Sequence, residues 1–228
     1  QMDNVLDELN KRAKTRLERI QAASMNAKRA AFVNDMPLVL TIGKSTLKLF
    51  DITIPDSPDE CHQFIDQKMH SIKKLLNGFK STDETLCQSL LSKLPRLENR
   101  EIIELADGFP TLVFASSFTN PLLSTCFLAQ FAEIMLTYGY SSELIKCIGY
   151  FAASVGSMDQ HVFSRSEILE LVNFMLQLCE RECPRELFRA YQIFAVFVAH
   201  RYISLIQCKQ YIEKALEMSL KVGKYAHS

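Results

Sequence analysis

His62, Asp66 and His70 are spaced four residues apart, so on a helix they would lie along one side, next to Cys61. Imidazole, carboxylate and thiolate groups are the ligands that zinc prefers in proteins. The row lies on the flank of the expected helix, however, away from the apolar stripe that begins at Ile65. A metal-binding histidine usually needs a supporting hydrogen-bond partner, which a solvent-facing flank does not supply. We therefore predict no metal site here.

The remaining patterns that could do chemistry are fragments of known motifs. Cys179 and Cys183 have no second cysteine pair downstream, unlike zinc-binding or redox cysteines. The segment 43–45 reads Gly-Lys-Ser, like the end of a phosphate-binding loop, but the earlier glycine of that motif is replaced by Leu38. The sequence also lacks a nucleophile elbow, a dinucleotide fingerprint and a His-Glu-x-x-His motif. We predict that the protein is not an enzyme and holds no cofactor or metal.

The composition is that of a globular, helical protein. The 228 residues are 48% hydrophobic and 23% charged, with 26 basic against 26 acidic side chains. Glycine and proline number only seven each, below their average usage, whereas phosphate-binding loops and turn-rich β-sandwiches use more glycine. The seven cysteines are odd in number and scattered among apolar residues, which is typical of reduced thiols. These features favour a mainly α, intracellular protein of the cytoplasm or nucleus.

Residues 1–55 are predicted to form a helix and a short β-hairpin that act as an interaction segment. Residues 3–32 contain neither proline nor glycine, and their thin apolar seam is interrupted by Arg16. Residues 38–54 contain two β-branched runs that meet at Gly43, a pattern typical of a hairpin. The helix would either dock on its own domain, bind a partner or pair with a second copy of itself. The hairpin would likewise either brace the fold or offer an edge strand to a partner.

Residues 56–228 are predicted to form a helical-repeat domain. Serine and asparagine caps, several of them followed by proline or glutamate, mark helix starts at short intervals. The predicted caps are Ser57, Ser81, Asn99, Asn120, Ser141 and Ser164. About eight helices joined by short links then cover residues 57–223.

The stretch from Asp107 to Val113, continuing through residues 116–117 to the segment 127–132, resembles an armadillo-type unit. In that family a Gly-x-x-x-Leu-Val helix, here beginning at Gly108, precedes a loop and a helix with a small residue at its packing seam. Residues 168–178 followed by 188–198 look similar but lack the glycine. The resemblance implies an armadillo- or HEAT-like α-solenoid, with an irregular helical bundle as the alternative. It implies nothing about chemistry.

The region around residues 109–132 is uncharged and rich in aromatic side chains. The Asn120-Pro121 pair divides it, so we predict no membrane span. The aromatic side chains of residues 109–151 either fill the core or, where exposed, line a hydrophobic groove for an amphipathic or basic peptide. The central segment 101–164 carries one basic and six acidic side chains, a net charge of −5 that would favour basic partners.

Two classes of function fit these features. The first is a non-catalytic scaffold or adaptor subunit of a larger complex, which binds a peptide, helix or strand of another protein. The second is a nucleic-acid-binding or nuclear transport adaptor that uses the basic first helix. A net charge of +3 over residues 1–32 and a pI of about 7.1 make this second class the weaker expectation. The residues expected to contact a partner are Leu6, Leu9, Arg16, Ile20, Leu47, Leu49 and Ile52.

Overall fold

The computed structural model describes residues 12–158 and 162–225, and all regular elements in this part of the chain are helical. The first elements are α2 (Arg16–Phe32), α3 (Met36–Lys48), α4 (Pro58–Phe79), α5 (Leu86–Lys93), α6 (Arg100–Asp107) and α7 (Phe109–Thr119). They are followed by α8 (Pro121–Tyr138), α9 (Ser142–Ser157), α10 (Arg165–Glu182), the 3₁₀ turn η1 (Pro184–Glu186) and α11 (Leu187–Ile193). The chain closes with the π-helix η2 (Phe194–Ala199), α12 (His200–Tyr202) and α13 (Leu205–Tyr225). The predicted mainly α fold is confirmed.

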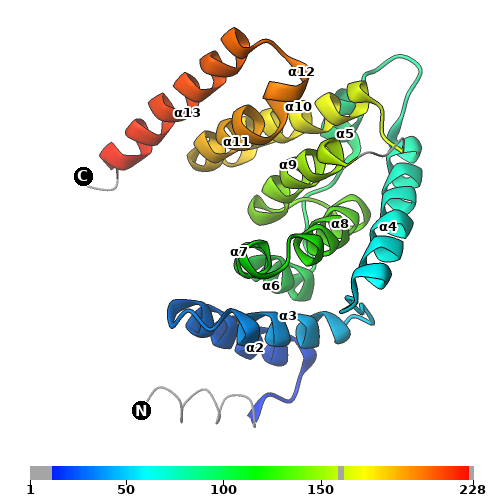
Figure 1. Cartoon of the computed structure of the whole chain (residues 1–228), viewed down its shortest axis with the longest axis vertical. Helices are drawn as coiled ribbons and strands as arrows, with labels where there is room; N and C mark the ends of the chain where they lie inside the picture. Colours follow the sequence, from blue (N-terminus) through cyan, green and yellow to red (C-terminus); the bar gives the residue numbers. More distant parts are fainter. Residues whose placement is uncertain (1–11, 159–161, 226–228) are drawn as a thin grey trace.

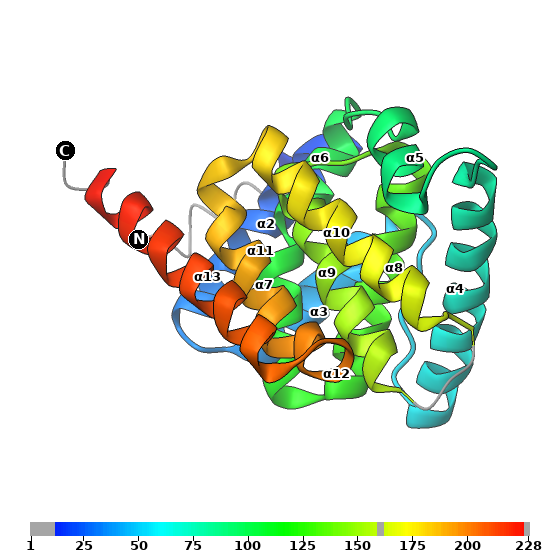
Figure 2. The same ribbon diagram turned by 90° about the horizontal axis from the view of Figure 1, so that it is seen from above.

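The helices stack in chain order from one end of the molecule to the other (Figure 1). α2 and α3 pack on each other and against α6 and α7, and then α8, α9, α10 and α11 follow, each against the next. α13 packs on α11 at the far end, while α4 and α5 lie along one edge against α8 and α10 (Figure 2). A single apolar core runs through this stack. The arrangement is compatible with a helical repeat.

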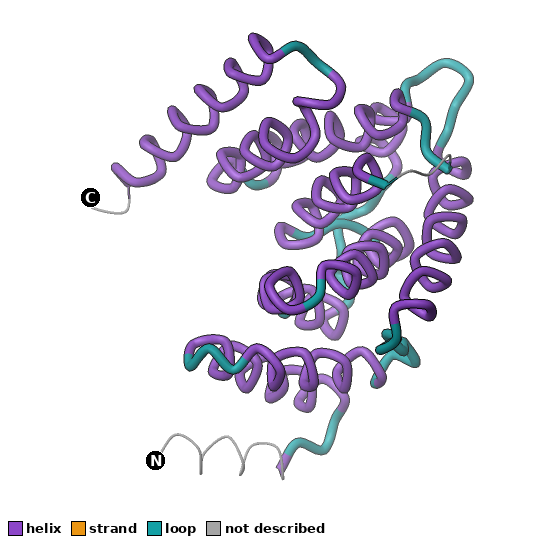
Figure 3. Tube along the Cα trace, viewed as in Figure 1, coloured by secondary structure: helices purple, strands orange, loops and turns teal. Residues whose placement is uncertain are grey.

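The predicted β-hairpin is wrong, because the described residues contain no strand and residues 36–48 form α3 (Figure 3). The carboxylate of Asp35 caps this helix by accepting a hydrogen bond from the Leu38 N–H at 3.1 Å. Pro37 stands in the first turn, where a missing N–H costs nothing. An N-cap aspartate followed by proline is a helix-start signal, and the β-branched residues after it obscured that signal.

One face of α3 is buried against the rest of the protein, which decides its conformation. Val39, Gly43, Thr46 and Leu47 occur at i, i+4, i+7 and i+8 and are all buried, with α2 and α7 as the neighbours. A Cβ atom at position 43 would lie 1.9 Å from Leu112 Cδ2, so glycine permits α3 and α7 to approach closely. Burial of this face outweighs the preference of its β-branched residues for strands.

Most of the helices predicted from capping residues begin where expected. Ser57 Oγ accepts a hydrogen bond from the Glu60 N–H at 3.3 Å at the start of α4. Ser164 and Glu167 form a capping box at the start of α10. The other predicted caps that start a helix are Asn99 for α6, Asn120 for α8 and Ser141 for α9. The predicted cap at Ser81 is wrong, because α5 begins at Leu86 and Thr85 Oγ1 accepts the capping hydrogen bond from the Gln88 N–H at 3.3 Å. The other helix starts depend on contacts within a few residues, so the sequence alone suffices to find them.

The uncharged stretch 109–132 forms two helices rather than one. α7 ends at Thr119, Asn120 caps α8, and Pro121 is the first residue of α8. α8 contacts α4, α7 and α9, which accounts for its apolar surface on several sides. Among the described residues, no helix has both the length and the apolar character needed to span a membrane.

Candidate functional site

The aromatic side chains of residues 109–151 divide between the core and the surface. Phe109 and Phe131 are buried, and their ring centroids lie 4.9 Å apart. Phe114 and Phe118, on α7, are 53% and 74% exposed, and their rings meet edge to face at 4.8 Å. Exposed aromatic pairs of this kind mark surfaces that bind other molecules more often than single exposed side chains do.

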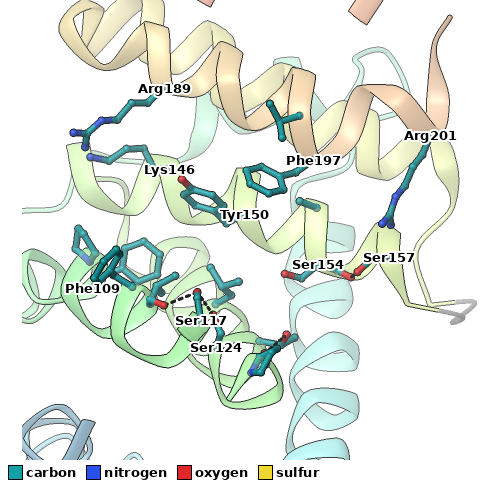
Figure 4. A pocket seen from close by; sticks show the side chains of 18 residues that line it. Phe109, Ser117, Ser124, Lys146, Tyr150, Ser154, Ser157, Arg189, Phe197 and Arg201 are labelled. Atoms are coloured by element: carbon teal, nitrogen blue, oxygen red, sulfur yellow. Dashed lines mark hydrogen bonds between the residues drawn. The ribbon is translucent and has the colours of Figure 1, made fainter. Parts of the chain in front are cut away.

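Phe114 lines a groove of about 630 Å³ between α7, α8, α9 and the segment from α11 to α12 (Figure 4). We call this feature the aromatic groove. α7 and α8 contribute Phe109, Pro110, Val113, Phe114, Ser117, Pro121, Ser124, Thr125 and Leu128. α9 and the opposite wall contribute Lys146, Tyr150, Ala153, Ser154, Ser157, Arg189, Val196, Phe197 and Arg201. The groove is largely apolar along its length and has basic side chains at its ends.

One face of α9 runs along the aromatic groove. Lys146, Tyr150, Ala153 and Ser157 follow one another at intervals of four, three and four residues, which places them on one helix face. At 1.5 Å per residue, this face is about 16 Å long. Its central members are small or aromatic, so α9 leaves space for a bound segment instead of filling the groove with long side chains.

The π-helix η2 forms the opposite wall. Phe194 and Val198 point inward and are buried, whereas Val196 and Phe197 remain 49% and 46% exposed at the groove. The Phe197 ring packs against the Tyr150 ring of α9, with the centroids 6.0 Å apart. π-helical turns are rare and occur frequently at functional sites, because the wider turn directs side chains differently from an α-helix.

Basic residues lie at both ends of the aromatic groove. At one end, Lys146 Nζ contacts carboxylate oxygens of Glu143 at 2.9 Å and Glu186 at 3.1 Å. Arg189 lies beside Lys146, and its Nη1 atom is 3.6 Å from Glu186 Oε2. Arg201 extends from the other end toward Ser157 (Figure 4). None of the 18 described residues that line the groove is acidic.

The Tyr150 hydroxyl points along the groove toward Lys146 and Arg189 (Figure 4). Burial raises the pKa of this phenol, and the positive charges of Arg189 and Lys146 lower it by a smaller amount. The hydroxyl is therefore protonated at neutral pH and can donate a hydrogen bond. At this end of the groove the phenol therefore lies beside two cations that are already paired with Glu143 and Glu186.

The serine and threonine hydroxyls of the groove are engaged with their own helices. Ser117 Oγ donates to the Val113 carbonyl oxygen at 2.6 Å and lies 3.2 Å from Ser124 Oγ. Ser157 Oγ donates to the Ser154 carbonyl oxygen at 2.6 Å. No histidine, aspartate or glutamate is among the described lining residues, so these hydroxyls have no general base beside them.

Among the residues predicted to contact a partner, those that the structure describes do not line the aromatic groove. Leu6 and Leu9 lie outside the described residues. Ile20 and Leu47 are 1% and 0% exposed in the protein's own core, so both have a packing role. Leu49 and Ile52, in the segment that follows α3, are half-buried.

Arg16 holds the start of α2 onto the neighbouring elements. Its guanidinium forms an ion pair with Glu101 and lies 4.9 Å from the centre of the Phe50 ring. Arg16 and Ile52 also line a smaller, more polar pocket of about 430 Å³ near the C-terminal end of α8. This pocket is lined in part by the ion pair Lys68–Glu133, so its charges are already compensated within the protein.

The row of candidate metal ligands lies on the exposed flank of α4. Nδ1 of His62 is 2.8 Å from the Pro58 carbonyl oxygen, and Nδ1 of His70 is 2.8 Å from that of Asp66. Across residues 12–158 and 162–225, no group of three histidine, cysteine or acidic residues is placed to hold a metal ion. Burial raises the pKa of Cys87 to about 11, so this thiol is a poor nucleophile at neutral pH.

Sequence reasoning found one wall of the aromatic groove and missed the other. The aromatic concentration pointed to α7 through α9, but Arg189, Phe197 and Arg201 join them only through the packing of α11 and η2 on α9. One feature of the sequence could have indicated the groove-lining face of α9. The small residues Ala153 and Ser157 lie on the same helix face as Tyr150, so this face leaves space beside the aromatic ring. No signal in the sequence marks the π-helix.

Comparison with known proteins adds no relative: no protein-family model, no curated protein and no solved structure matches this chain.

Proposed function

We propose that this chain is a non-catalytic protein-interaction module, an armadillo-like array that serves as a scaffold or adaptor subunit of a larger complex. The aromatic groove would hold a segment of another protein. The observation that carries the proposal is that Phe114, Val196 and Phe197 are about half exposed around a groove of about 630 Å³. Large apolar side chains around a concave surface are the usual anchors of protein recognition.

The shape of the groove favours a peptide segment over a small molecule. The α9 face is about 16 Å long, which corresponds to about three turns of helix. The groove is flanked by helices on both long sides, as in complexes where an amphipathic helix lies in a hydrophobic groove. Tyr150 and Phe197 lie where such a segment would place its central apolar side chain.

The charges give less support to nucleic-acid binding. The aromatic groove has three basic side chains, and Lys146 already contacts two carboxylates. On the basic first helix, Arg16 is paired with Glu101. A protein that depends on phosphate contacts needs several uncompensated cations along a path.

Photocrosslinking tests the proposal directly. A benzoylphenylalanine placed at position 114 should crosslink, in native cells, to one defined segment of another protein. The matched control carries the same group at Phe32, which is 89% exposed at the end of α2 and outside the groove. Mass spectrometry then identifies the crosslinked peptide for each position.

A crosslink specific to position 114, and lost when Phe197→Asp is added, would support the groove as a protein-binding site. Crosslinks to nucleic acid would favour the second class of function. The same proteins captured equally from positions 114 and 32 would contradict a role for the groove.

A further inference from the structure

Gln130 supplies an unpaired hydrogen-bond acceptor to the pocket of about 430 Å³ near the C-terminal end of α8, which we call the polar pocket. The residue lines this pocket although it is only 3% exposed, and its Nε2 atom donates to Glu133 Oε2 at 3.4 Å. Its Oε1 atom is the one buried side-chain nitrogen or oxygen in residues 12–158 and 162–225 that has no hydrogen-bond partner. Nearly all buried polar atoms in native proteins are paired, so this oxygen calls for a donor that the described residues do not supply.

The Gln130 amide can turn this oxygen toward the pocket with little loss. The terminal torsion of a glutamine side chain is broad, and 3.4 Å is long for a hydrogen bond from an N–H group. Glu133 keeps other donors, because its carboxylate also accepts from Lys68 Nζ and Ser71 Oγ. A small rotation about the terminal torsion therefore presents Oε1 to a molecule in the polar pocket.

The charges that line the polar pocket are compensated within the protein. Lys68 pairs with Glu133, and Arg16 pairs with Glu101, which does not line the pocket. Asp51 also lies close to Arg16, since the hydrogen bond with Glu101 and, by a smaller amount, the charge of Asp51 raise the pKa of the guanidinium. A charged ligand would have to displace one of these pairs or remain unpaired itself. The pocket therefore favours an uncharged ligand.

A hydrogen-bond donor lies beside the unpaired acceptor. Lys68 Nζ and Gln130 Nε2 both donate to the same oxygen of Glu133, so the two side chains are neighbours. An ammonium group has three N–H donors, and Glu133 takes one of those of Lys68. A single hydroxyl group satisfies both neighbours, because it donates one hydrogen bond and accepts others.

The rest of the polar pocket mixes polar groups with an apolar wall. Thr137 Oγ1 donates to the Glu133 carbonyl oxygen at 2.8 Å, so the hydroxyl oxygen can still accept a hydrogen bond. The apolar side chains of the wall are Phe50, Ile52, Ile102, Leu105 and Ile134. Several hydroxyls on a carbon ring match this mixture, and the volume lies within the range of small-molecule sites.

We infer that the polar pocket binds an uncharged polyhydroxylated ring, a monosaccharide or a cyclic polyol, with one hydroxyl that donates to Gln130 Oε1 and accepts from Lys68 Nζ. This inference goes beyond the proposed function, because none of the described residues lines both the polar pocket and the aromatic groove.

Binding of named probes to the full chain tests this inference. Saturation-transfer NMR is recorded with glucose, galactose and myo-inositol, and at least one should bind with a Kd of the order of 1 mM. Glucuronate and glucosamine carry a negative and a positive charge on the same ring, so each should bind about tenfold more weakly than glucose. The side-chain amide signals of Gln130 should shift when the bound probe is added to the unmodified protein.

A substitution separates a binding role of the amide from a structural one. Gln130→Met keeps the length of the side chain and removes the amide, so probe binding should fall at least about tenfold. Its Tm should be unchanged or higher, because the unpaired acceptor is gone. The matched control is Gln192→Met, since Gln192 is exposed on α11 and lines neither the polar pocket nor the aromatic groove.

The outcomes distinguish this inference from the proposed function. Absence of probe binding, or a crystal grown with the probe that shows only an ordered water on Gln130 Oε1, would overturn the polyol site. Probe binding retained by Gln130→Met, or Gln130 amide signals that do not move, would overturn the role of Gln130. Phe197→Asp, which should abolish binding of a groove-dependent peptide, should leave probe binding unchanged. Either site can therefore fail without the other.

Discussion

The N-terminal helix pair α2–α3 and the aromatic groove are both rich in apolar side chains, but the protein uses them in opposite ways. Ile20 and Leu47 of the helix pair are covered by the protein's own helices. Phe114 and Phe197 of the groove stay about half exposed although α7, α9 and η2 are packed around them. Apolar spacing within one element therefore shows that a face is buried, not what buries it. A binding surface is what remains exposed after all of the chain's helices have packed.

The largest expected effect comes from the buried face of the helix pair. Leu47→Ala should lower the free energy of unfolding by about 2–5 kcal/mol, because it leaves a cavity beneath α3. Leu38→Ala, in the same helix but 45% exposed, should change it by less than about 0.5 kcal/mol. Urea denaturation of both variants measures the difference. Equal effects would contradict the packing of α3 described above.

A second test concerns the ion pairs of Glu167 on α10 with Lys73 and Lys80, which lie outside both regions. Burial alone would raise the pKa of Glu167, but hydrogen bonds from Lys73, Lys80 and Ser164 outweigh it and lower the pKa to about 2. Because the folded pKa lies below the ordinary value of 4.5, the stabilisation is present above about pH 4.5 and is lost as the pH falls toward 2.

Glu167→Gln should therefore lower the free energy of unfolding by about 2 kcal/mol at pH 7 and by much less near pH 2.5. Unfolding curves at several pH values for the protein and its variant give this comparison. A difference that stays constant across the range would assign the effect to packing and not to charge.

Glycine substitutions compare a crowded helix contact with an open one. Gly43→Ala should destabilise the protein by about 1–2 kcal/mol, because the added methyl group meets the buried Leu112 side chain. Gly78→Ala, near the end of α4, adds a methyl group with nothing within 4 Å and should stabilise by about 0.5–1 kcal/mol. Thermal melts provide the measurement. The same sign for both variants would contradict close packing of α3 on α7.

The groove should show the reverse pattern, with a large effect on binding and a small one on folding. Phe197→Ala removes a side chain that is 46% exposed, so we expect little change in thermal stability. Affinity for a groove-dependent peptide should fall about tenfold, or about 1.4 kcal/mol. Titration calorimetry and a thermal melt on the same sample test both parts. A variant that unfolds as readily as Leu47→Ala would show that Phe197 belongs to the core.

The smallest predicted effect concerns the Tyr150 hydroxyl. Tyr150→Phe keeps the ring and removes one hydrogen-bond donor, so affinity for a groove-dependent peptide should fall about threefold. Because the pKa of this phenol is raised, binding by the unmodified protein should not change between pH 7 and 9 through its ionisation. Anisotropy titrations across this range measure both. A loss of affinity at pH 9 that is absent in Tyr150→Phe would contradict the protonated hydroxyl.

The sequence by itself determined where most helices begin, because a cap acts within one turn. Ser57, Asn120 and Ser164 each hold N–H groups two or three residues ahead of them, and their types identify them without knowledge of the fold. The same local chemistry divided residues 109–132 into two helices at Asn120-Pro121. The mainly helical class and the concentration of aromatic side chains were also evident from residue types alone.

Only the tertiary structure decided between strand and helix at residues 36–48 and between core and surface among the aromatic residues. α3 is a helix because Val39, Gly43 and Leu47 form one face that is buried by the preceding helix α2 and by α7, which follows much later in the chain. The aromatic groove exists because α11 and η2 bring Arg189 and Phe197 opposite α9. Burial and local charge depend on which distant segments meet in space, whereas residue spacing describes only one segment at a time.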